Sequence, residues 1–203
     1  MGINLYSLKY IHEKLKKYEK EFNKFNICLL GNLYLRDDTF NYQKQKMSKI
    51  YKVAMDYFKE LDMSSFSIDI NGKDGAIPID LSEEIPDDQK NKYHILLNGG
   101  TAEHVNNQYQ CFKNIHDLCK DKSLIFHISP EVGSWPNHCN NWYTEEFFRI
   151  LGYKNNYNII DIHRNAINGK GKGYLIYATY QKIDDWTFMS EDSFYRLDIH
   201  RKL

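Results

Sequence analysis

The sequence predicts an α/β protein, a three-layer α/β/α sandwich around a mostly parallel, seven-stranded sheet that ends in an antiparallel hairpin. Three observations predict this fold class. Apolar strand patterns alternate with helical patterns along most of the chain, which is typical of a parallel sheet covered by helices on both faces. The last two strand patterns follow each other across a connection too short for a crossover, so that pair is antiparallel. The length of 203 residues suits one domain with a full-sized core.

The chain begins with two helical patterns and a strand between them. Residues 5–25 place apolar side chains at steps of three and four, with lysines and glutamates on the other face, which predicts an amphipathic helix. Residues 26–31, with the sequence N-I-C-L-L-G, are a short apolar run closed by glycine and predict a buried strand. Residues 43–61 return to helical spacing and predict a second helix.

Three strand patterns follow. Residues 65–70 predict a strand that ends near an acid, and residues 76–81 predict a shorter strand. Pro78 indicates that this shorter strand lies at an edge of the sheet, because proline cannot donate a hydrogen bond to a neighbouring strand. Residues 93–97 predict a buried strand.

The second half of the chain continues the alternation. Residues 105–119 predict a helix, and residues 123–128 predict an apolar strand. Residues 144–152 begin with a capping threonine, have acids in the first turn and end in glycine, which are the signals of a helix. Residues 157–163 and 174–181 predict the two strands of the closing hairpin.

The composition limits the possible partners and compartments. The 27 basic and 27 acidic residues balance at a pI near 7.1, which gives no strong signal for nucleic acid or for an anionic membrane. No apolar run is long enough for a membrane span, and there is no signal-peptide pattern. The four cysteines are scattered without a C-x-x-C pair, as in proteins of a reducing compartment. We therefore expect a soluble, cytoplasmic protein.

The junction at residues 98–104, N-G-G-T-A-E-H, suggests a ligand site. A buried strand ends there in two glycines, and an acid and a histidine stand at the start of a helix. Ligands of open α/β sheets bind outside the carboxyl ends of the strands, near the point where the strand order reverses. A tight turn with a polar cap is the alternative explanation, because glycine favours such turns and an acid near a helix N-terminus is stabilising.

In this order of motifs, residues 26–182 resemble the class I S-adenosylmethionine-dependent methyltransferases, which have a Rossmann-like fold. The motifs that carry the resemblance are E-H at 103–104, L-I-F-H-I-S-P at 124–130, W-P-N-H at 135–138, W-Y at 142–143, F-F at 147–148 and L-G-Y at 151–153. The resemblance implies transfer of a methyl group from S-adenosylmethionine to a small-molecule or sugar-like acceptor. It divides the chain into an N-terminal helix (1–25), the methyltransferase-like domain (26–182) and a C-terminal extension (183–203).

Carried over position by position, the resemblance implies a cofactor site at the ends of the strands. Gly31 and Asn32 would line the methionine end of the cofactor. Asp69 would accept hydrogen bonds from the ribose hydroxyls. Asp80 would meet the adenine amino group, with Leu81 beside the ring.

The same resemblance implies the residues nearest the reaction. Asn98 and Gly99 would close over the sulfonium, and Glu103 with His104 would face the acceptor. His104 is a candidate general base, because imidazole titrates near the working pH. His138 is a further candidate residue of the acceptor site, and these three polar side chains form the predicted catalytic set.

The chain departs from the family's pattern in its first loop. That loop normally has a G-x-G-x-G pattern, which lets the backbone approach the cofactor, whereas this chain has Gly31 alone. Two hypotheses follow: a methyltransferase that binds the cofactor through a rebuilt loop, or a catalytically inactive methyltransferase-like binding or scaffold domain. A nicotinamide-binding enzyme fits less well, because G-x-G-x-x-G is absent after the first strand. The helix at 5–25 is expected to cover the sheet edge or the cofactor, or to mediate self-association as a homodimer.

Two further patterns are given no functional role. His127, Glu131, His138 and Cys139 fit no standard metal-binding spacing, so no metal site is predicted. Residues 169–173, G-K-G-K-G, lack the Walker spacing and lead into a strand, so they predict a flexible turn and no phosphate loop.

Overall fold

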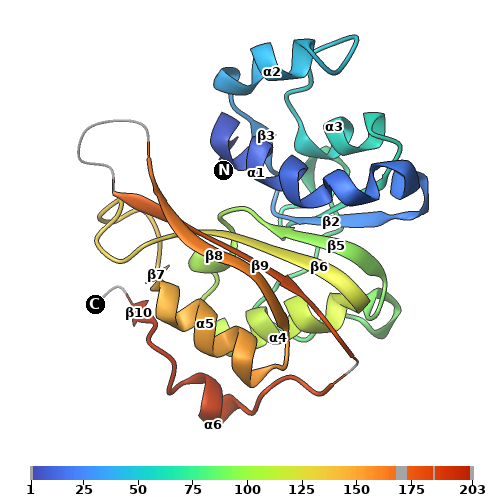
Figure 1. Cartoon of the computed structure of the whole chain (residues 1–203). Coiled ribbons are helices and arrows are strands. Elements are labelled where there is room, and N and C mark those ends of the chain that lie inside the picture. The colour runs from blue at the N-terminus through green and yellow to red at the C-terminus, as the bar shows by residue number, and fades with distance from the viewer. Residues whose placement is uncertain (1, 168–172, 185, 202–203) are drawn as a thin grey trace.

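The computed structural model describes residues 2–167, 173–184 and 186–201, and it confirms the predicted fold class. The main sheet has the strand order β4-β2-β5-β6-β9-β8 (Figure 1). β4, β2, β5 and β6 are parallel to one another, whereas β9 is antiparallel to both of its neighbours. In chain order these strands are β2 (Asn26–Leu30), β4 (Ser64–Ile68), β5 (Tyr93–Asn98), β6 (Cys119–Pro130), β8 (Asn158–Ala166) and β9 (Tyr174–Gln181).

Helices cover both faces of the sheet and make the three layers (Figure 1). One face carries α1 (Leu5–Leu15), α2 (Phe40–Lys44) and α3 (Ala54–Glu60), and the other carries α4 (Gln108–Leu118), α5 (Glu145–Lys154) and α6 (Glu191–Phe194). A separate apolar core lies between the sheet and each helical layer. No helix in the described part of the chain is both long and apolar enough to cross a membrane.

α1 is held against the sheet by polar as well as apolar contacts. Its N-terminus is capped by Asn4, whose side chain accepts a hydrogen bond from the Ser7 N–H at 2.8 Å. The hydroxyl of Tyr10 lies 2.6 Å from Thr179 Oγ1 on β9. The predicted helix at 5–25 is α-helical only to Leu15 and continues as the 3-10 helix η1 (Lys16–Lys24), in which Phe22 alone is buried. With so little to pack, that segment lacks the apolar contacts that stabilise a long helix.

The helix predicted at 43–61 was wrong in its extent, because α2 and α3 are separate helices. Gln43 is buried at the end of α2, where its Oε1 accepts the Tyr51 N–H at 2.7 Å and its Nε2 donates to the Tyr51 carbonyl at 3.1 Å. These two bonds satisfy backbone groups that a continuous helix would have paired internally. They stabilise the loop between the two helices instead.

The strand predicted at 76–81 is also wrong, so the main sheet has six strands among the described residues, rather than seven. This segment makes only one parallel bridge, between Ile68 and Ile77. Pro78 has no N–H with which to continue the pairing, and the Ile79 N–H bonds back to the Ile77 carbonyl at 3.0 Å. Ile79 still lies in the core on the α4 side.

Two small sheets fasten the ends of the chain. β1 (Gly2–Ile3) pairs in parallel with β3 (Tyr34–Leu35), and β10 (His200–Arg201) pairs antiparallel with β7 (Asn141–Trp142). The first pair places the N-terminal residues beside the loop that follows β2. The turn predicted at 169–173 lies outside the described residues except for Gly173.

Candidate functional site

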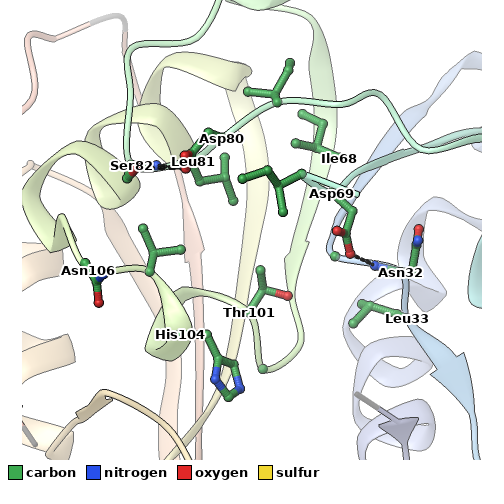
Figure 2. Close-up of a pocket in the computed structure, with 15 residues that line it drawn as sticks. Asn32, Leu33, Ile68, Asp69, Asp80, Leu81, Ser82, Thr101, His104 and Asn106 are labelled. Atoms are coloured by element: carbon green, nitrogen blue, oxygen red, sulfur yellow. Dashed lines mark hydrogen bonds between the residues drawn. The ribbon is translucent and has the colours of Figure 1, made fainter. Parts of the chain in front are cut away.

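A cavity of about 430 Å³ lies outside the carboxyl ends of β2, β4 and β5. We call it the first cavity. Figure 2 shows Asp80 and Leu81 on one wall, Asp69 and Asn32 on another, and Thr101 and His104 across from them. The residues with a predicted role that line it are Gly31, Asn32, Asp69, Asp80, Leu81 and His104, and Gly100 and Thr101 come from the predicted junction at 98–104. The lining residues that were not predicted are Leu33, Ile68, Ile70, Ile79, Ser82, Val105 and Asn106.

Gly31 makes the turn at the end of β2. Its φ is +81°, in the left-handed region that favours glycine, and its N–H donates to the Ile68 carbonyl at 2.7 Å. A Cβ at this position would lie 2.5 Å from Thr101 Oγ1, which donates to the Leu30 carbonyl at 2.6 Å. The single glycine of this loop therefore stands where the chain has no room for a side chain. Thr101 follows directly after the glycine pair, which is the signal by which it could have been found.

Asp69 comes directly after β4 and is bound by two backbone N–H groups. Its Oδ2 accepts from Asn32 at 2.9 Å and its Oδ1 from Asn71 at 3.1 Å. Because a carboxylate has about four acceptor positions, both oxygens keep capacity for a ligand. Asn32 is held in turn through its amide, which donates to the side chain of Asn71 at 3.0 Å.

Asp80 is fixed by the residue two positions on. Its Oδ1 accepts from the Ser82 N–H at 2.8 Å and from the Ser82 hydroxyl at 2.7 Å. These hydrogen bonds, the backbone one first, lower the pKa of Asp80. The other oxygen, Oδ2, has no hydrogen bond within the described ranges. Leu81 is buried beside this carboxylate, so an apolar surface and a charged acceptor lie together.

Asn98 does not line the first cavity, but its side chain holds the turn at 100–104, which does. The side chain is fully buried, and its Oδ1 accepts from the N–H groups of Thr101 at 3.3 Å and Ala102 at 3.1 Å. Its Nδ2 lies 3.1 Å from His127 Nδ1, and since Oδ1 is already the acceptor, the amide donates to the ring. Burial lowers the pKa of His127 to about 3, which keeps the ring neutral and able to accept.

Glu103 belongs to the turn at 98–104, but its side chain points into the protein and lines neither this cavity nor the second cavity described below. Its side chain is fully buried, and neither carboxyl oxygen has a hydrogen-bond partner among the described residues. Burial raises the pKa of Glu103 to about 8, so the carboxyl group is protonated at neutral pH. The predicted position of Glu103 facing the acceptor is therefore not where the structure places it.

A second cavity of about 370 Å³ lies on the other side of the Gly99–Gly100 turn. Gly99 and His138 line this second cavity, whereas His104 lines the first. The two histidine rings have their centroids 5.2 Å apart in an edge-to-face arrangement. Burial, and then the neighbouring His138, lower the pKa of His104, which favours its neutral, proton-accepting form. The residues lining the second cavity are Gly2, Ile3, Asn4, Ser7, Arg36, Gly99, Ile128, Trp135, His138, Ile167 and Leu175.

Two asparagines join the loop of His138 to the turn of His104. The Asn140 N–H donates to the Glu103 carbonyl at 3.1 Å, and its side chain donates to the His104 carbonyl at 3.1 Å. Asn141 is buried and donates to the carbonyls of Glu103 at 3.2 Å and Val105 at 3.0 Å. These contacts bring two predicted histidines together that lie far apart in the sequence.

Among the residues that the structure describes, no three His, Cys, Asp or Glu side chains form a group that could hold a metal ion. His127 is instead packed between aromatic rings, with Phe112 stacked at 5.4 Å and Phe148 at 5.2 Å.

Comparison with known proteins finds similarity in structure alone. No protein family matches the sequence, and no curated protein is similar to it. The 1,6-didemethyltoxoflavin-N1-methyltransferase of Burkholderia thailandensis, solved with 1,6-didemethyltoxoflavin and S-adenosylhomocysteine, has a TM-score of 0.54 at 12% identity, over 87% of this chain and 81% of that chain. A SAM-dependent methyltransferase from Archaeoglobus fulgidus has a TM-score of 0.49 at 13% identity, over 86% of this chain and 94% of that chain.

The chain has the fold of the class I S-adenosylmethionine-dependent methyltransferases, as the sequence predicted. The comparisons give no support to the alternative hypothesis of an inactive scaffold domain.

Proposed function

We propose that this chain, which has the fold of the class I S-adenosylmethionine-dependent methyltransferases, is itself such an enzyme and acts on a small-molecule acceptor. The observation that carries the proposal is the first cavity, which lies at the carboxyl ends of three parallel strands and has two carboxylates on its walls. Its volume of about 430 Å³ is within the range of small-molecule sites.

The residues present fit a nucleoside with a charged sulfonium. S-adenosylmethionine, when bound, supplies a methyl group activated by a positively charged sulfur. Asp69 keeps acceptor positions for the ribose hydroxyls, and Asp80 keeps an oxygen for the adenine amino group. Leu81 offers an apolar surface for the adenine ring, and Gly31 leaves the space that Thr101 occupies on the cavity wall.

The structure also supports an account of the missing loop glycines. Leu33 stands two positions after Gly31, at a place where the family has glycine, and its side chain packs toward Gly99. A Cβ on Gly99 would lie 3.1 Å from Leu33 Cδ1, which is tighter than ordinary contact. Gly99 therefore gives Leu33 the room that lets a large side chain coexist with an open cavity. This arrangement is the rebuilt first loop of the proposed enzyme.

In this proposal the two histidines act on the acceptor. His104 and His138 lie on the two sides of the wall between the cavities, and His104 is poised in its neutral form. Either imidazole can accept the proton that an acceptor hydroxyl or amine loses. Asn98 positions the turn, and Glu103, buried without a partner, is assigned no binding role.

Calorimetric titration with S-adenosylhomocysteine tests the proposal. We expect the folded wild-type protein to bind it with micromolar affinity and Asp69→Ala to lose binding, because the ribose would lose its acceptor. Asp56→Ala, a change to an exposed acid on α3, is the matched control and should bind like the wild type. Absence of binding to a wild-type protein shown by circular dichroism to be folded would overturn the proposal.

A further inference from the structure

The two cavities differ in the charge of the side chains that line them. The first cavity has the carboxylates of Asp69 and Asp80. The described residues that line the second cavity include no carboxylate, and their ionisable side chains are Arg36 and His138. The rest of its wall is largely apolar, from Ile3, Ile128, Ile167 and Leu175. The second cavity is therefore suited to an apolar body with a negatively charged group.

Arg36 lines this cavity and has no counter-ion among the residues that the structure describes. Its backbone N–H donates to the Ile3 carbonyl at 3.0 Å, which holds it next to β1. Within the described residues no carboxylate lies within 4.0 Å of its guanidinium, whereas Arg149 pairs with Glu145 at 3.3 Å. A guanidinium binds carboxylates through two parallel hydrogen bonds, so Arg36 is available for an acidic ligand.

Gly2 leaves the space in which the side chain of Arg36 lies. A Cβ at Gly2 would be 2.7 Å from Arg36 Cγ and 3.3 Å from Arg36 Cδ. Because Gly2 lacks a side chain, the aliphatic part of Arg36 can pass directly over the N-terminal strand. The sequence thus keeps Arg36 on the wall of the cavity.

Trp135 forms an aromatic wall and is held in a costly conformation. Its φ is +43°, which is a true outlier for a bulky side chain. The preceding Ser134 ties the loop down: its hydroxyl donates to the Tyr174 carbonyl at 3.0 Å, and its carbonyl accepts from Trp142 Nε1 at 2.7 Å. The surrounding structure therefore imposes the strain, which brings the Trp135 ring to 5.8 Å from that of His138.

The other polar side chains of the cavity are already occupied. Asn4 caps α1, and the Ser7 hydroxyl lies 2.9 Å from the Tyr177 hydroxyl. Polar recognition of a ligand is therefore left to Arg36 and His138. Gly99 lines this cavity and the next residue, Gly100, lines the first, so the two cavities are neighbours at this turn.

We propose that the second cavity is the acceptor site and that it takes a small, flat organic acid, whose acidic group pairs with Arg36 while its ring packs on Trp135. This inference rests on the proposed function, because the second cavity is an acceptor site only if the first one binds the methyl donor. Its size of about 370 Å³ suits one or two fused rings.

Binding of model acids tests the inference without turnover. The probes are benzoate, indole-2-carboxylate and quinoline-4-carboxylate, each compared with its neutral carboxamide by protein-observed NMR, with and without S-adenosylhomocysteine. We expect at least one acid to bind about tenfold more tightly than its amide, because a charge-assisted pair is lost in the amide. Arg36→Gln should abolish this preference, Arg36→Lys should keep part of it, and the matched control Arg149→Gln should leave it unchanged.

A second variant tests the geometry without removing the charge. Gly2→Ala should displace the Arg36 side chain and weaken acid binding several-fold, although the guanidinium is still present. Equal binding of acids and amides, or no binding of any acid at 5 mM, would overturn the inference. Acid binding by a wild-type protein that does not bind S-adenosylhomocysteine would overturn the proposed function and, with it, the assignment of the second cavity as an acceptor site, but not its preference for acids. Asp69→Ala is expected to keep acid binding while it loses S-adenosylhomocysteine binding.

Discussion

Gly31 and Gly133 have nearly the same backbone conformation in very different surroundings. Their φ angles are +81° and +84°, both in the left-handed region. A Cβ on Gly31 would meet Thr101 Oγ1 at 2.5 Å, whereas a Cβ on Gly133 would have nothing within 4 Å. Alanine at either position meets the same backbone strain, but only alanine at 31 also meets a steric contact. Comparing alanine at the two positions therefore separates the effect of backbone strain from the effect of steric contact.

We expect Gly31→Ala to destabilise the protein more than Gly133→Ala. Strain in the left-handed region costs about 1–2 kcal/mol at both positions, and crowding against Thr101 adds about 1–3 kcal/mol at Gly31 alone. Urea unfolding of both variants measures the difference. Gly31→Ala should also weaken S-adenosylhomocysteine binding at least tenfold, because Thr101 forms part of the cavity wall. Equal losses of stability in the two variants would contradict the steric role of Gly31.

The sequence predicted which residues lie at the edge of the sheet that forms the first cavity better than it predicted which of their side chains point into that cavity. Asp69 and Asp80 line the cavity, as expected for residues at the carboxyl edge of a parallel sheet. Asn98 and Glu103 are near the same edge but point into the protein. Their direction depends on the path of the turn, since Asn98 folds back onto two N–H groups of that turn. The pattern of polar and apolar residues does not determine the backbone path of this turn.

At the scale of elements, the loop at 131–140 joins the wall of the second cavity to the turn of His104, which lines the first. It leaves β6, presents Trp135 and His138 to the second cavity, and reaches β7. Asn141 anchors it to the turn of His104 with two hydrogen bonds from a buried amide. Loss of that amide removes one donor from each carbonyl, although the Glu103 carbonyl still accepts from the Asn140 N–H and the Val105 carbonyl from Gln108 Nε2. The loop and the turn are therefore coupled at this residue.

We expect Asn141→Ala to loosen the second cavity while leaving the first largely intact. The two lost hydrogen bonds should lower the free energy of unfolding by about 1–3 kcal/mol. Acid binding, followed by NMR, should weaken more than S-adenosylhomocysteine binding, followed by calorimetry, because only the second cavity is lined by this loop. Asn165→Ala, a change to a half-buried residue of β8, is the control. Equal weakening of both ligands would show that the loop does not act on the second cavity specifically.

Element types were predictable where a periodic pattern agreed with burial, as in α5 and β9. They were not predictable where a side chain replaced a backbone partner. Gln43 ends α2 by bonding both backbone groups of Tyr51, and an apolar pattern at 43–61 hides that break. Pro78 indicated an edge strand, yet it stopped the pairing altogether after Ile77. In both cases the apolar residues reach the core as predicted, but the hydrogen bonds do not follow the pattern.

At the scale of the whole molecule, three buried ionisable groups oppose one another in their effect on stability. Burial raises the pKa of Glu103 to about 8 and lowers the pKa of His127 to about 3. Burial, with a smaller effect of Lys46, lowers the pKa of His12 to about 4. His12 lies 2.7 Å from the Tyr57 hydroxyl, between α1 and α3, whereas His127 of β6 packs against Phe112 of α4 and Phe148 of α5, so the buried histidines lie on opposite faces of the sheet. All three are uncharged in the folded protein near neutral pH.

The sign of each contribution follows from the protons bound in the folded and unfolded states. Between about pH 4.5 and 6.5 the unfolded chain binds two protons on the histidines that the folded protein lacks, and the folded protein binds one more on Glu103. From these three groups the unfolded state thus binds one more proton. The lowered pKa values of His94 and His104 add to this excess, so stability rises with pH. Between about pH 6.5 and 8 only Glu103 differs, the folded state binds the extra proton, and stability falls as pH rises.

We therefore expect the free energy of unfolding to pass through a maximum near pH 6.5, with a decline of about 1.4 kcal/mol per pH unit above it and a rise of at least about 1.4 kcal/mol per pH unit below it. Glu103→Gln should remove the decline above that pH and steepen the rise below it by about 1.4 kcal/mol per pH unit, because the histidines then act unopposed. Urea unfolding from pH 4.5 to 8.5 measures both curves, with the exposed Glu146→Gln as the control. A curve for Glu103→Gln parallel to that of the wild type would mean that Glu103 is ionised in the folded protein, and that a polar partner reaches its buried oxygens.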